Sequence, residues 1–423
     1  MQNPIFLLAF LSAVVPRTHQ YSEKATGCTS KPLLPDRPYM VVWNHPSSGC
    51  EAHGIDLNLS AWDIVENRND AFAGDNMIIY YNLGDFPALD RKTGRVTKNG
   101  GVPQRGDLTY HLTLANKQVN SSTKPGFDGI AVIDMESWRP RFGHNFDALW
   151  QYQNISMEIV RDRFPYLNKS AVAAEAAKEF ETGARLFLEG TLNVSRDLRP
   201  DGHWGFYQFP RAWPGNDELA YLWRASRGLF PEIYMSSKTP YATVEKNIQG
   251  TVNETLRVWA KFCTPNTLIL PYSLCQDSAK DFFSVENLTL AIGLPGQMGA
   301  AGVVLWGASS YYSTPNECRL LQSYVNTTLG PYVKNLTQFL SNCSSSLCSS
   351  HGRCVDKDYE TLVQAQRRKS GQRQCLVRQE QLEKRGKGGG EGRVSGGEGV
   401  SPYDDYVCRC FAGWTGDHCE KKD

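Results

Sequence analysis

The sequence predicts an α/β fold, a TIM-like (β/α) barrel of seven or eight strands, with a small disulfide-rich domain at the C-terminus. Between Pro38 and Pro331, short apolar runs alternate with amphipathic stretches, and cysteines gather near the C-terminus. Near-continuous apolar strands separated by helices are typical of a parallel sheet that is covered on its outer face. About seven such units over roughly 290 residues favour a barrel over an open sheet.

The individual elements follow from the same pattern. A helix is expected at Ala171–Glu189, where Ala, Phe and Leu recur at helical spacing, with Ser170 as its N-cap. The expected strands are Tyr39–Trp43, Met77–Tyr81, Gly129–Asp134, Trp204–Tyr207, Glu232–Met235, Leu268–Tyr272 and Gly302–Trp306. In elements of this kind apolar periodicity indicates core packing, so functional side chains are expected at the strand ends.

The composition excludes several classes of partner. The hydrophobic fraction is 41%, the charged fraction is 21% and the formal net charge is +1, which is not the footprint of a nucleic-acid binder. The eight histidines are scattered without an H-E-x-x-H motif, and no Gly-rich phosphate loop opens a helix. We therefore expect no nucleic acid, metal or organic cofactor, and a monomer.

Several features point to secretion. Residues 1–20 are predicted to be a signal peptide around the apolar run Ile5–Val15, although its first residues lack a positive charge. Twelve cysteines and many N-x-[ST] sequons suit the secretory route, and the tail CEKKD is no hydrophobic anchor signal. The expected glycosylation sites are Asn58, Asn120, Asn154, Asn168, Asn193, Asn253, Asn287, Asn326 and Asn335, with Asn342 left aside because Cys343 follows it.

The C-terminal cysteines have a spacing of their own. Cys343, Cys348 and Cys354 follow C-x4-C-x5-C, and Cys408, Cys410 and Cys419 follow C-x-C-x8-C around a Gly-Trp-x-Gly turn. Such a set is a strong signal for an EGF-like domain, which needs disulfides because it cannot bury a core. We therefore assign residues 21–338 to the barrel and 339–423 to an EGF-like domain, interrupted by a disordered, charged and Gly-rich insertion at 356–407. The resemblance to EGF modules implies the pairs Cys343–Cys354, Cys348–Cys408 and Cys410–Cys419.

An acidic pair is the sharpest feature of the barrel sequence. Asp134 and Glu136 directly follow the buried strand run Ile130–Ile133. Side chains at i and i+2 of an extended chain point the same way, so both carboxyls should enter the barrel mouth. Two carboxyls in one partly desolvated place do not both ionise cheaply, so one keeps its proton near neutral pH and can act as a general acid. A bare D-x-E is more often a helix cap or a surface salt bridge, but the position after a buried strand favours an active site.

At these residues the chain resembles a known family. AVIDMESWRP is similar to the active-site signature of the hyaluronidases, the animal and venom endoglycosidases that cleave hyaluronan at N-acetylglucosamine. The likeness covers most of the chain, with WNHPSSGC, NGGVPQ, WGFYQFP, LFPEIYM, GAAGVVLWG, TLGPYVKN and SSHGRC in order. It implies a secreted endo-β-N-acetylhexosaminidase of the hyaluronoglucosaminidase type that hydrolyses hyaluronan, with chondroitin as a possible second glycosaminoglycan.

The resemblance also implies roles for single residues. Glu136 matches the proton donor, and Asp134 matches the residue that orients the substrate's acetamido group, whose oxygen attacks the anomeric carbon with overall retention. Tyr207 and Tyr234 match tyrosines that position the sugar, whereas Tyr80, Trp306 and Arg139 match further substrate-side positions, with Arg139 expected to brace the acidic pair. The alternative for each aromatic residue is a core side chain with a satisfied polar tip.

The resemblance extends to the remaining cysteines, but the chain also departs from the family pattern at three places. The resemblance implies a Cys50–Cys318 disulfide, Cys263 and Cys275 could pair across LILPY, and Cys28 and Cys375 are unassigned. The connection from Phe209 to Leu222 is short, and Met135 stands where most relatives have Trp, so looser packing behind the acids is expected. The arginine with which relatives are thought to bind the uronate carboxylate would fall near Thr251 by ungapped counting, and it is absent there. These departures keep open an alternative, a glycosaminoglycan-binding protein with weak activity or none.

Overall fold

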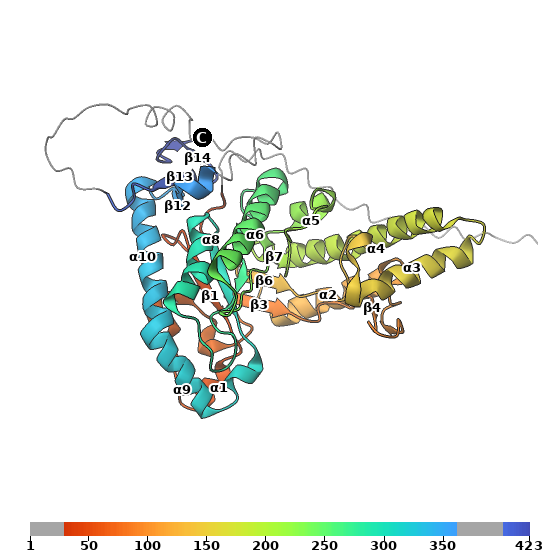
Figure 1. Ribbon diagram of the computed structural model, residues 1–423, viewed down its shortest axis with the longest axis horizontal. Coiled ribbons are helices and arrows are strands. Elements are labelled where there is room, and N and C mark those ends of the chain that lie inside the picture. Colours follow the sequence, from red (N-terminus) through yellow and green to blue (C-terminus); the bar gives the residue numbers. More distant parts are fainter. Residues whose placement is uncertain (1–28, 362–400) are drawn as a thin grey trace, which may run out of the picture.

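The computed structural model describes residues 29–361 and 401–423 (Figure 1). The predicted signal peptide, Cys28, Cys375 and most of the predicted insertion therefore lie outside the described residues. The described part contains parallel strands at its centre, with helices packed around them. No helix of the described residues is long and apolar enough to span a membrane.

The central strands form three parallel ladders. The first ladder has the order β10 (Tyr272–Ser273), β11 (Gly302–Trp306), β1 (Met40–Asn44) and β2 (Ile64–Val65). The second has the order β3 (Met77–Tyr80), β6 (Ile130–Ile133) and β7 (His203–Phe206), and the third joins β8 (Gly228–Leu229) to β9 (Leu268–Ile269). All of these pairings are parallel, as the alternation of apolar runs and helices predicts.

Short contacts connect the three ladders. Tyr207 and Phe230 form an isolated parallel bridge between the second and third ladders, and Glu232 forms another with Tyr272. No backbone ladder joins β2 to β3 in the described chain; instead the buried Asn67 side chain accepts from the Met77 N–H at 3.0 Å and donates to the Met77 carbonyl at 2.9 Å. A side-chain amide thus makes the hydrogen bonds that a ladder would supply there.

Two strand predictions need correction, and proline explains both. The run Glu232–Met235 is not a strand apart from the single bridge at Glu232; the strand here is β8 at Gly228–Leu229. The run Leu268–Tyr272 is split into β9 and β10. Pro231 and Pro271 stand at the two breaks, and proline has no N–H to donate to a ladder.

The strands separate two layers of core. Met77, Ile79 and their counterparts on neighbouring strands pack into an inner apolar cluster, whereas Ile78 and Tyr80 pack outward against the helices. Because successive side chains of a strand point to opposite faces, each strand contributes to both layers. The inner cluster fixes which residues reach the open end of the strands.

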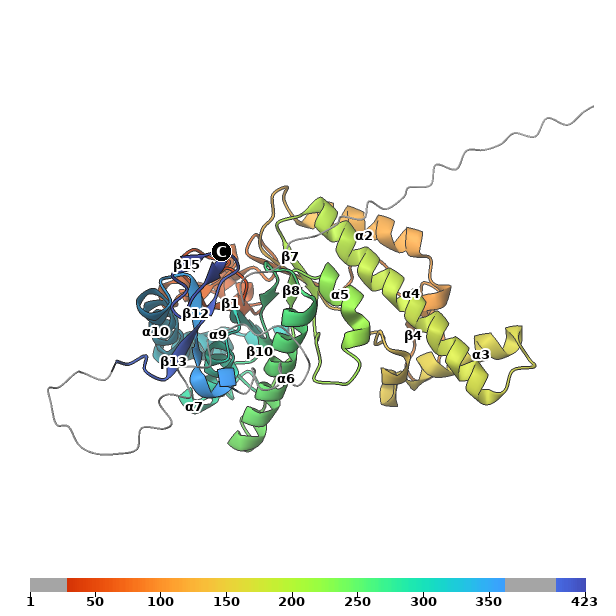
Figure 2. The same ribbon diagram turned by 90° about the horizontal axis from the view of Figure 1, so that it is seen from above.

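Helices cover the strands from opposite sides (Figures 1 and 2). On one side α4 packs against α2 and α3, and on the other α9 leads into α10. Their bounds are α2 (Leu108–Ser122), α3 (Trp150–Arg163), α4 (Lys169–Leu198), α6 (Tyr241–Phe262), α9 (Pro315–Tyr324) and α10 (Gly330–Leu347). Shorter helices are α1 (Ser48–Ala52), α5 (Ala220–Ala225), α7 (Val285–Leu288) and α8 (Leu294–Gln297).

Helix α4 is longer than the sequence pattern predicts. It begins at Lys169, and its N-cap is Asn168, whose side-chain oxygen accepts from the Ala171 N–H at 2.9 Å. Ser170 is therefore inside the first turn and the predicted cap is wrong, because the residue that caps must lie before the helical backbone begins. Gly183 in the middle of α4 lets the backbone at Pro103 and Gln104 approach, since a Cβ there would lie 2.7 Å from it.

The C-terminal module consists of residues 343–361 and 401–423 in the described chain. Its disulfides are Cys343–Cys354, Cys348–Cys408 and Cys410–Cys419, the pairs that the resemblance implies. They hold two antiparallel hairpins, β12 (Gly352–Asp356) with β13 (Tyr406–Cys410) and β14 (Trp414–Thr415) with β15 (Lys421–Lys422). The predicted insertion 356–407 is too wide at both ends, because residues 357–361 are helical and β13 begins at Tyr406.

Two buried arginines attach this module to the barrel. Arg353 and Arg409 face each other across β12 and β13. Arg353 donates to the Pro38 carbonyl at 2.7 Å, and Arg409 donates to the Met298 carbonyl at 2.8 Å and pairs with Glu360. Helix α10 also runs through the predicted 338/339 boundary and carries Cys343. In the described chain the module is thus continuous with the barrel's last helix.

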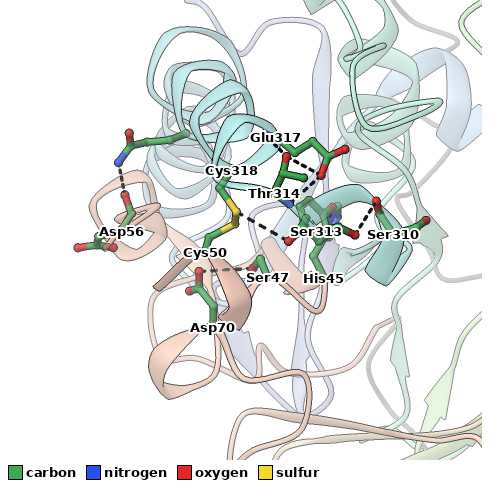
Figure 3. The surroundings of a disulfide bond; sticks show 12 residues. His45, Ser47, Cys50, Asp56, Asp70, Ser310, Ser313, Thr314, Glu317 and Cys318 are labelled. Carbon is green, nitrogen blue, oxygen red and sulfur yellow. Dashed lines mark hydrogen bonds between the residues drawn. A yellow bond between two sulfur atoms is a disulfide. The ribbon is translucent and has the colours of Figure 1, made fainter. Parts of the chain in front are cut away.

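Outside the C-terminal module, the cysteines of the described residues form one disulfide and leave two free thiols. Cys50 of α1 and Cys318 of α9 are bonded, which ties the loop after β1 to the last part of the barrel (Figure 3). Cys263 and Cys275 are free, so their predicted pairing is wrong. Cys263 lies 3.6 Å from the Trp223 carbonyl oxygen, whereas the Cys275 sulfur lies 3.8 Å from His45 Nε2. The two thiols therefore have separate surroundings.

The predicted glycosylation sites differ in exposure. Asn154, Asn253 and Asn287 are half-buried on helices, where a glycan has less room. The exposed ones are Asn58, Asn120, Asn168, Asn193, Asn326 and Asn335.

Candidate active site

The acidic pair lies at the carboxyl end of β6. Ile130 and Val132 of this strand belong to the inner cluster, so Asp134 and Glu136, two and four residues further on, continue the same alternation. Asp134 is half-buried and Glu136 is exposed. Both line one cleft with a volume of about 250 Å³. The structure therefore brings the two predicted acids together in a hollow.

The surroundings of Asp134 favour its neutral form. Burial raises its pKa to about 7, and the negative charges of Glu136 and Glu232 act in the same direction. Its Oδ1 atom is buried and has no hydrogen-bond partner in the described chain. A buried acceptor without a donor is costly, so this oxygen is suited to receive a donor from a ligand.

Three predicted aromatic residues converge beside the acids. Tyr207, Tyr234 and Trp306 all belong to the inner cluster or pack against it. The ring centroids of Tyr207 and Tyr234 are 6.3 Å apart, and those of Tyr234 and Trp306 are 6.1 Å apart with nearly stacked planes. Burial raises the pKa of both tyrosine hydroxyls, which stay protonated as hydrogen-bond donors.

The prediction for Tyr80 is wrong by one residue. The Tyr80 ring packs outward against Trp204, and its hydroxyl is hydrogen-bonded to Ser122 Oγ at 2.6 Å, within the outer core. Tyr81 lines the cleft instead, and its hydroxyl accepts from Trp306 Nε1 at 3.1 Å. A one-residue step along an extended chain moves a side chain to the opposite face, and that step separates the two tyrosines.

The prediction that Arg139 braces the acids is also wrong. Its guanidinium donates to the His144 carbonyl at 2.7 Å and lies over the rings of Trp213 and Phe146, 4.7 Å and 5.0 Å from their centroids. In the described chain it makes no ion pair with either acid. Its contacts hold two loops beside the site, and they depend on Trp213, which is distant in sequence.

Two further polar residues of the site were missed. The Tyr207 hydroxyl donates to Glu232 Oε2 at 2.5 Å, and Gln208 Nε2 donates to Glu136 Oε1 and lies 3.4 Å from Glu232 Oε2. Gln208 thus connects two carboxylates. The backbone of Gln208 has a φ of 70°, a left-handed conformation that no pattern in the sequence predicts. Glu232 stands two residues before Tyr234, and this spacing could have indicated a shared face.

The short connection after Phe209 is held in place by helix α6. Asn216 Nδ2 donates to Glu254 at 2.6 Å, and Arg257 pairs with Asp217 at 2.8 Å. The connection supplies Arg211, whose pKa is lowered by burial and raised by the negative charges of Glu232 and Glu136. This loop therefore places one cation, Arg211, near the acids. Helix α6 has Thr251, and not an arginine, at the position where the sequence comparison expected a second cation.

The segment behind the acids is well packed. Met135 is 6% exposed, and Trp138 is fully buried with its indole N–H donating to the Pro87 carbonyl at 2.9 Å. The expectation that Met135 loosens this packing finds no support in its burial. Within residues 29–361 and 401–423, no group of three or more His, Cys, Asp or Glu side chains could hold a metal ion.

Comparison with known proteins places this arrangement in a family. The family model described as hyaluronidase matches residues 28–215 and 212–423. The chain belongs to the hyaluronidase family. This membership confirms the resemblance seen at AVIDMESWRP and makes the chain a member of a glycoside hydrolase family. The family model extends through the C-terminal module as well as the barrel.

Individual hyaluronidases agree over most of their length. The chain is 34% identical over 400 residues to hyaluronidase conohyal-P1 of Conus purpurascens, covering 91% of this chain and 81% of that protein. It is 34% identical to hyaluronidase-1 of Homo sapiens over 424 residues, covering 92% and 94%. Among solved structures, bee venom hyaluronidase in complex with a hyaluronic acid tetramer matches with a TM-score of 0.66 at 31% identity, covering 70% of this chain and 99% of that one.

Proposed function

We propose that this chain is a secreted endo-β-N-acetylhexosaminidase that hydrolyses hyaluronan with retention of anomeric configuration. One observation carries the proposal: Asp134, with a raised pKa and an unpartnered buried oxygen, lies beside Glu136 in a cleft that Tyr81 and Phe86 also line. Membership of the hyaluronidase family supports it. Chondroitin, which has the same alternation of uronate and N-acetylhexosamine, is the second substrate that we propose.

The reaction needs one acid and one orienting carboxylate. Glu136 gives its proton to the glycosidic oxygen as that oxygen leaves the anomeric carbon. At the same time the acetamido carbonyl oxygen of the substrate forms a bond to that carbon, while Asp134 accepts the acetamido N–H in the ionised form that it takes as the pH approaches its raised pKa of about 7. Water then attacks the anomeric carbon, the bond between that carbon and the acetamido oxygen breaks, and one proton of the water passes to Glu136.

The aromatic residues position the sugar in this proposal. The Tyr234 hydroxyl serves as a hydrogen-bond donor next to the acetamido group, because its raised pKa keeps it protonated. The Tyr207 hydroxyl donates its proton to Glu232, so its oxygen is what it offers to the sugar, as an acceptor. Trp306 and Tyr81 present ring faces to a pyranose at the edge of the cleft. Arg139 acts indirectly by fixing the Trp213 loop.

The setting of the enzyme is part of the same proposal. We assign residues 1–20 to a signal peptide, 21–338 to the catalytic barrel and 339–423 to an EGF-like module, and we expect a glycosylated monomer. The exposed sequons and the four disulfides of the described chain suit an oxidising, extracellular environment.

The test is a product analysis with the purified, full-length protein. Wild-type protein should release even-numbered oligosaccharides from hyaluronan, measured by mass, with the β-anomer formed first in a proton NMR time course. Glu136→Gln should lower kcat by at least about a thousandfold, since it removes the transferable proton. Glu286→Gln, an exposed carboxylate of α7, is the matched control and should retain full activity. Equal rates for wild type and Glu136→Gln would remove Glu136 from its role.

The alternative is a protein that binds glycosaminoglycan without cutting it. The short connection between Phe209 and Leu222 favours this alternative, because it leaves less chain to wall the cleft. Retention on immobilised hyaluronan with no new reducing ends after prolonged incubation would decide for the binder.

A further inference from the structure

Two cations, Arg91 and Lys98, line the cleft together with the acidic pair. Arg91 lies in the turn of the β4–β5 hairpin, formed by β4 (Ala88–Leu89) and β5 (Val96–Lys98), and Lys98 ends β5. Both line the cleft that also contains Asp134 and Glu136. Both are exposed at its edge, so a bound glycan could reach them.

Both cations keep unused hydrogen-bond donors. Arg91 donates one N–H to the backbone carbonyl of Glu136 at 2.7 Å, and Lys98 donates to Asn82 Oδ1 at 3.1 Å. Neither forms an ion pair with a carboxylate of the described residues, since both contacts are to neutral oxygens. A guanidinium has five N–H donors and an ammonium has three, so most remain available to a ligand.

Hydrogen bonds fix the conformation of the hairpin that carries these two cations. The Leu89 N–H donates to the Tyr152 hydroxyl at 3.0 Å, and Gln151 of α3 donates to the Lys92 carbonyl at 3.1 Å. The Asp90 side chain accepts the Thr93 N–H at 2.7 Å and so closes the turn. Arg91 is itself tethered to the backbone of Glu136, which fixes one end of its guanidinium. Such preorganisation reduces the entropy that binding must remove.

The charge balance of the cleft indicates what these cations bind. The charges of Glu136 and Glu232 both act on Asp134, so three carboxyl groups lie near one another, and a uronate-containing glycan brings a further carboxylate with every second sugar. Negative charges held near one another repel. Unpaired cations next to the acids offset this repulsion and also select for an anionic sugar.

We propose that Arg91 and Lys98 form a subsite for the carboxylate of a uronate next to the scissile bond. The inference rests on the proposed function, because it names which sugar group meets this wall of the cleft. It also supplies a uronate partner in a chain that has Thr251 where an arginine is expected. A carboxylate accepts two N–H donors from arginine at once, and lysine adds a point charge.

The test compares cations of one hairpin. Arg91→Gln and Lys98→Gln should each raise KM for hyaluronan octasaccharide by about tenfold with kcat changed less than twofold, the loss of one charge-assisted contact. Lys92→Gln and Arg95→Gln are exposed controls of the same hairpin that do not line the cleft, and their KM should stay within twofold. Lys98 touches neither acid, so its variant separates the loss of charge from a shift of the Glu136 backbone. With carboxyl-reduced hyaluronan, all variants should match wild type.

Binding measurements separate this subsite from the proposed reaction. In a Glu136→Gln background, fluorescence titration with hyaluronan octasaccharide should show about tenfold weaker binding when Lys98→Gln is added. That result with no hydrolysis by wild type would uphold the subsite and overturn the reaction. Hydrolysis with unchanged KM in Arg91→Gln and Lys98→Gln, or an equal loss in the Lys92 and Arg95 controls, would overturn the subsite alone. Neither binding nor hydrolysis would overturn both.

Discussion

The Tyr207 hydroxyl donates to Glu232 Oε2 at 2.5 Å, which places a third carboxylate against the acidic pair. Glu232 contributes to the raised pKa of Asp134, after burial and the charge of Glu136. The backbone of Glu232 forms a parallel β-bridge with Tyr272, so backbone pairing fixes the position of this charge. Glu232 is therefore a positioning residue that acts on Asp134 and Tyr207.

Glu232→Gln should move the pH dependence of activity. The variant removes a negative charge near Asp134 and keeps an oxygen acceptor for the Tyr207 hydroxyl, so the pKa of Asp134 falls from about 7. Because Asp134 works ionised in the proposed reaction, the acidic limb of kcat/KM should shift to lower pH. The measurement is a pH profile on hyaluronan from pH 4 to 8. A limb that stays in place, or moves to higher pH, contradicts the electrostatic role of Glu232.

Tyr81→Phe and Tyr80→Phe should have opposite effects. Tyr81→Phe removes the acceptor of the Trp306 indole N–H at the cleft, so kcat/KM should fall about tenfold with the melting temperature unchanged. Tyr80→Phe removes a hydroxyl that bonds Ser122 away from the cleft, so the free energy of unfolding should fall by about 1 kcal/mol with activity retained. Steady-state kinetics and denaturant unfolding of both variants check this. If instead Tyr80→Phe alone lost activity, the assignment of Tyr81 to the cleft would be wrong.

The sequence predicted the position of the acids because a buried strand precedes them. Ile130–Ile133 is apolar throughout, so the first charged residue, Asp134, marks the strand end, and Glu136 follows on the same face. The run MIIYY contains no charged residue that would indicate which of its side chains point inward. Both faces of a barrel strand are apolar, and nothing in the run says whether Tyr80 or Tyr81 points inward.

Other parts of the site depend on contacts that a linear pattern does not contain. Arg139 lies over Trp213, which is distant in sequence, and this contact draws its guanidinium away from the acids. Gln208 reaches Glu136 from a left-handed backbone conformation that favours Gly or Asn, so its identity gave no signal. Pro231 and Pro271 are visible in the sequence, and they could have indicated where the predicted strands break.

Removal of the Cys50–Cys318 disulfide should cost stability. The bond closes a loop of 268 residues, and the chain-entropy model gives about 5.6 kcal/mol for a loop of this length. Urea unfolding of Cys50→Ser/Cys318→Ser should therefore show a midpoint well below that of wild type. Cys263→Ser, which removes a half-buried free thiol, is the control and should change the midpoint little. A double variant as stable as this control contradicts the stabilising role of the bond.

Acid should destabilise the fold through His45. The His45 ring is buried, stacks on Trp43 at 3.8 Å between centroids, and is hydrogen-bonded through Nδ1 to the Tyr312 hydroxyl. Burial lowers its pKa to about 3, whereas an unfolded histidine has a pKa of about 6.5. Below pH 6.5 the unfolded chain therefore binds a proton that the folded chain does not. This contribution to stability is complete above pH 6.5 and is lost as the pH falls toward 3, by up to about 1.4 kcal/mol for each pH unit.

Asp134 has the opposite dependence, which is why a variant is needed to isolate His45. With its pKa raised to about 7, folded Asp134 keeps a proton that the unfolded chain releases above pH 4, so its contribution falls as the pH rises to 7. His45→Asn should lower stability at pH 7 through lost packing and flatten the pH dependence of the free energy of unfolding between pH 4.5 and 6.5. His53→Asn, at the exposed end of α1, should leave that slope unchanged. Urea unfolding at four pH values measures it, and an equal slope in wild type and His45→Asn would assign the acid sensitivity to other groups.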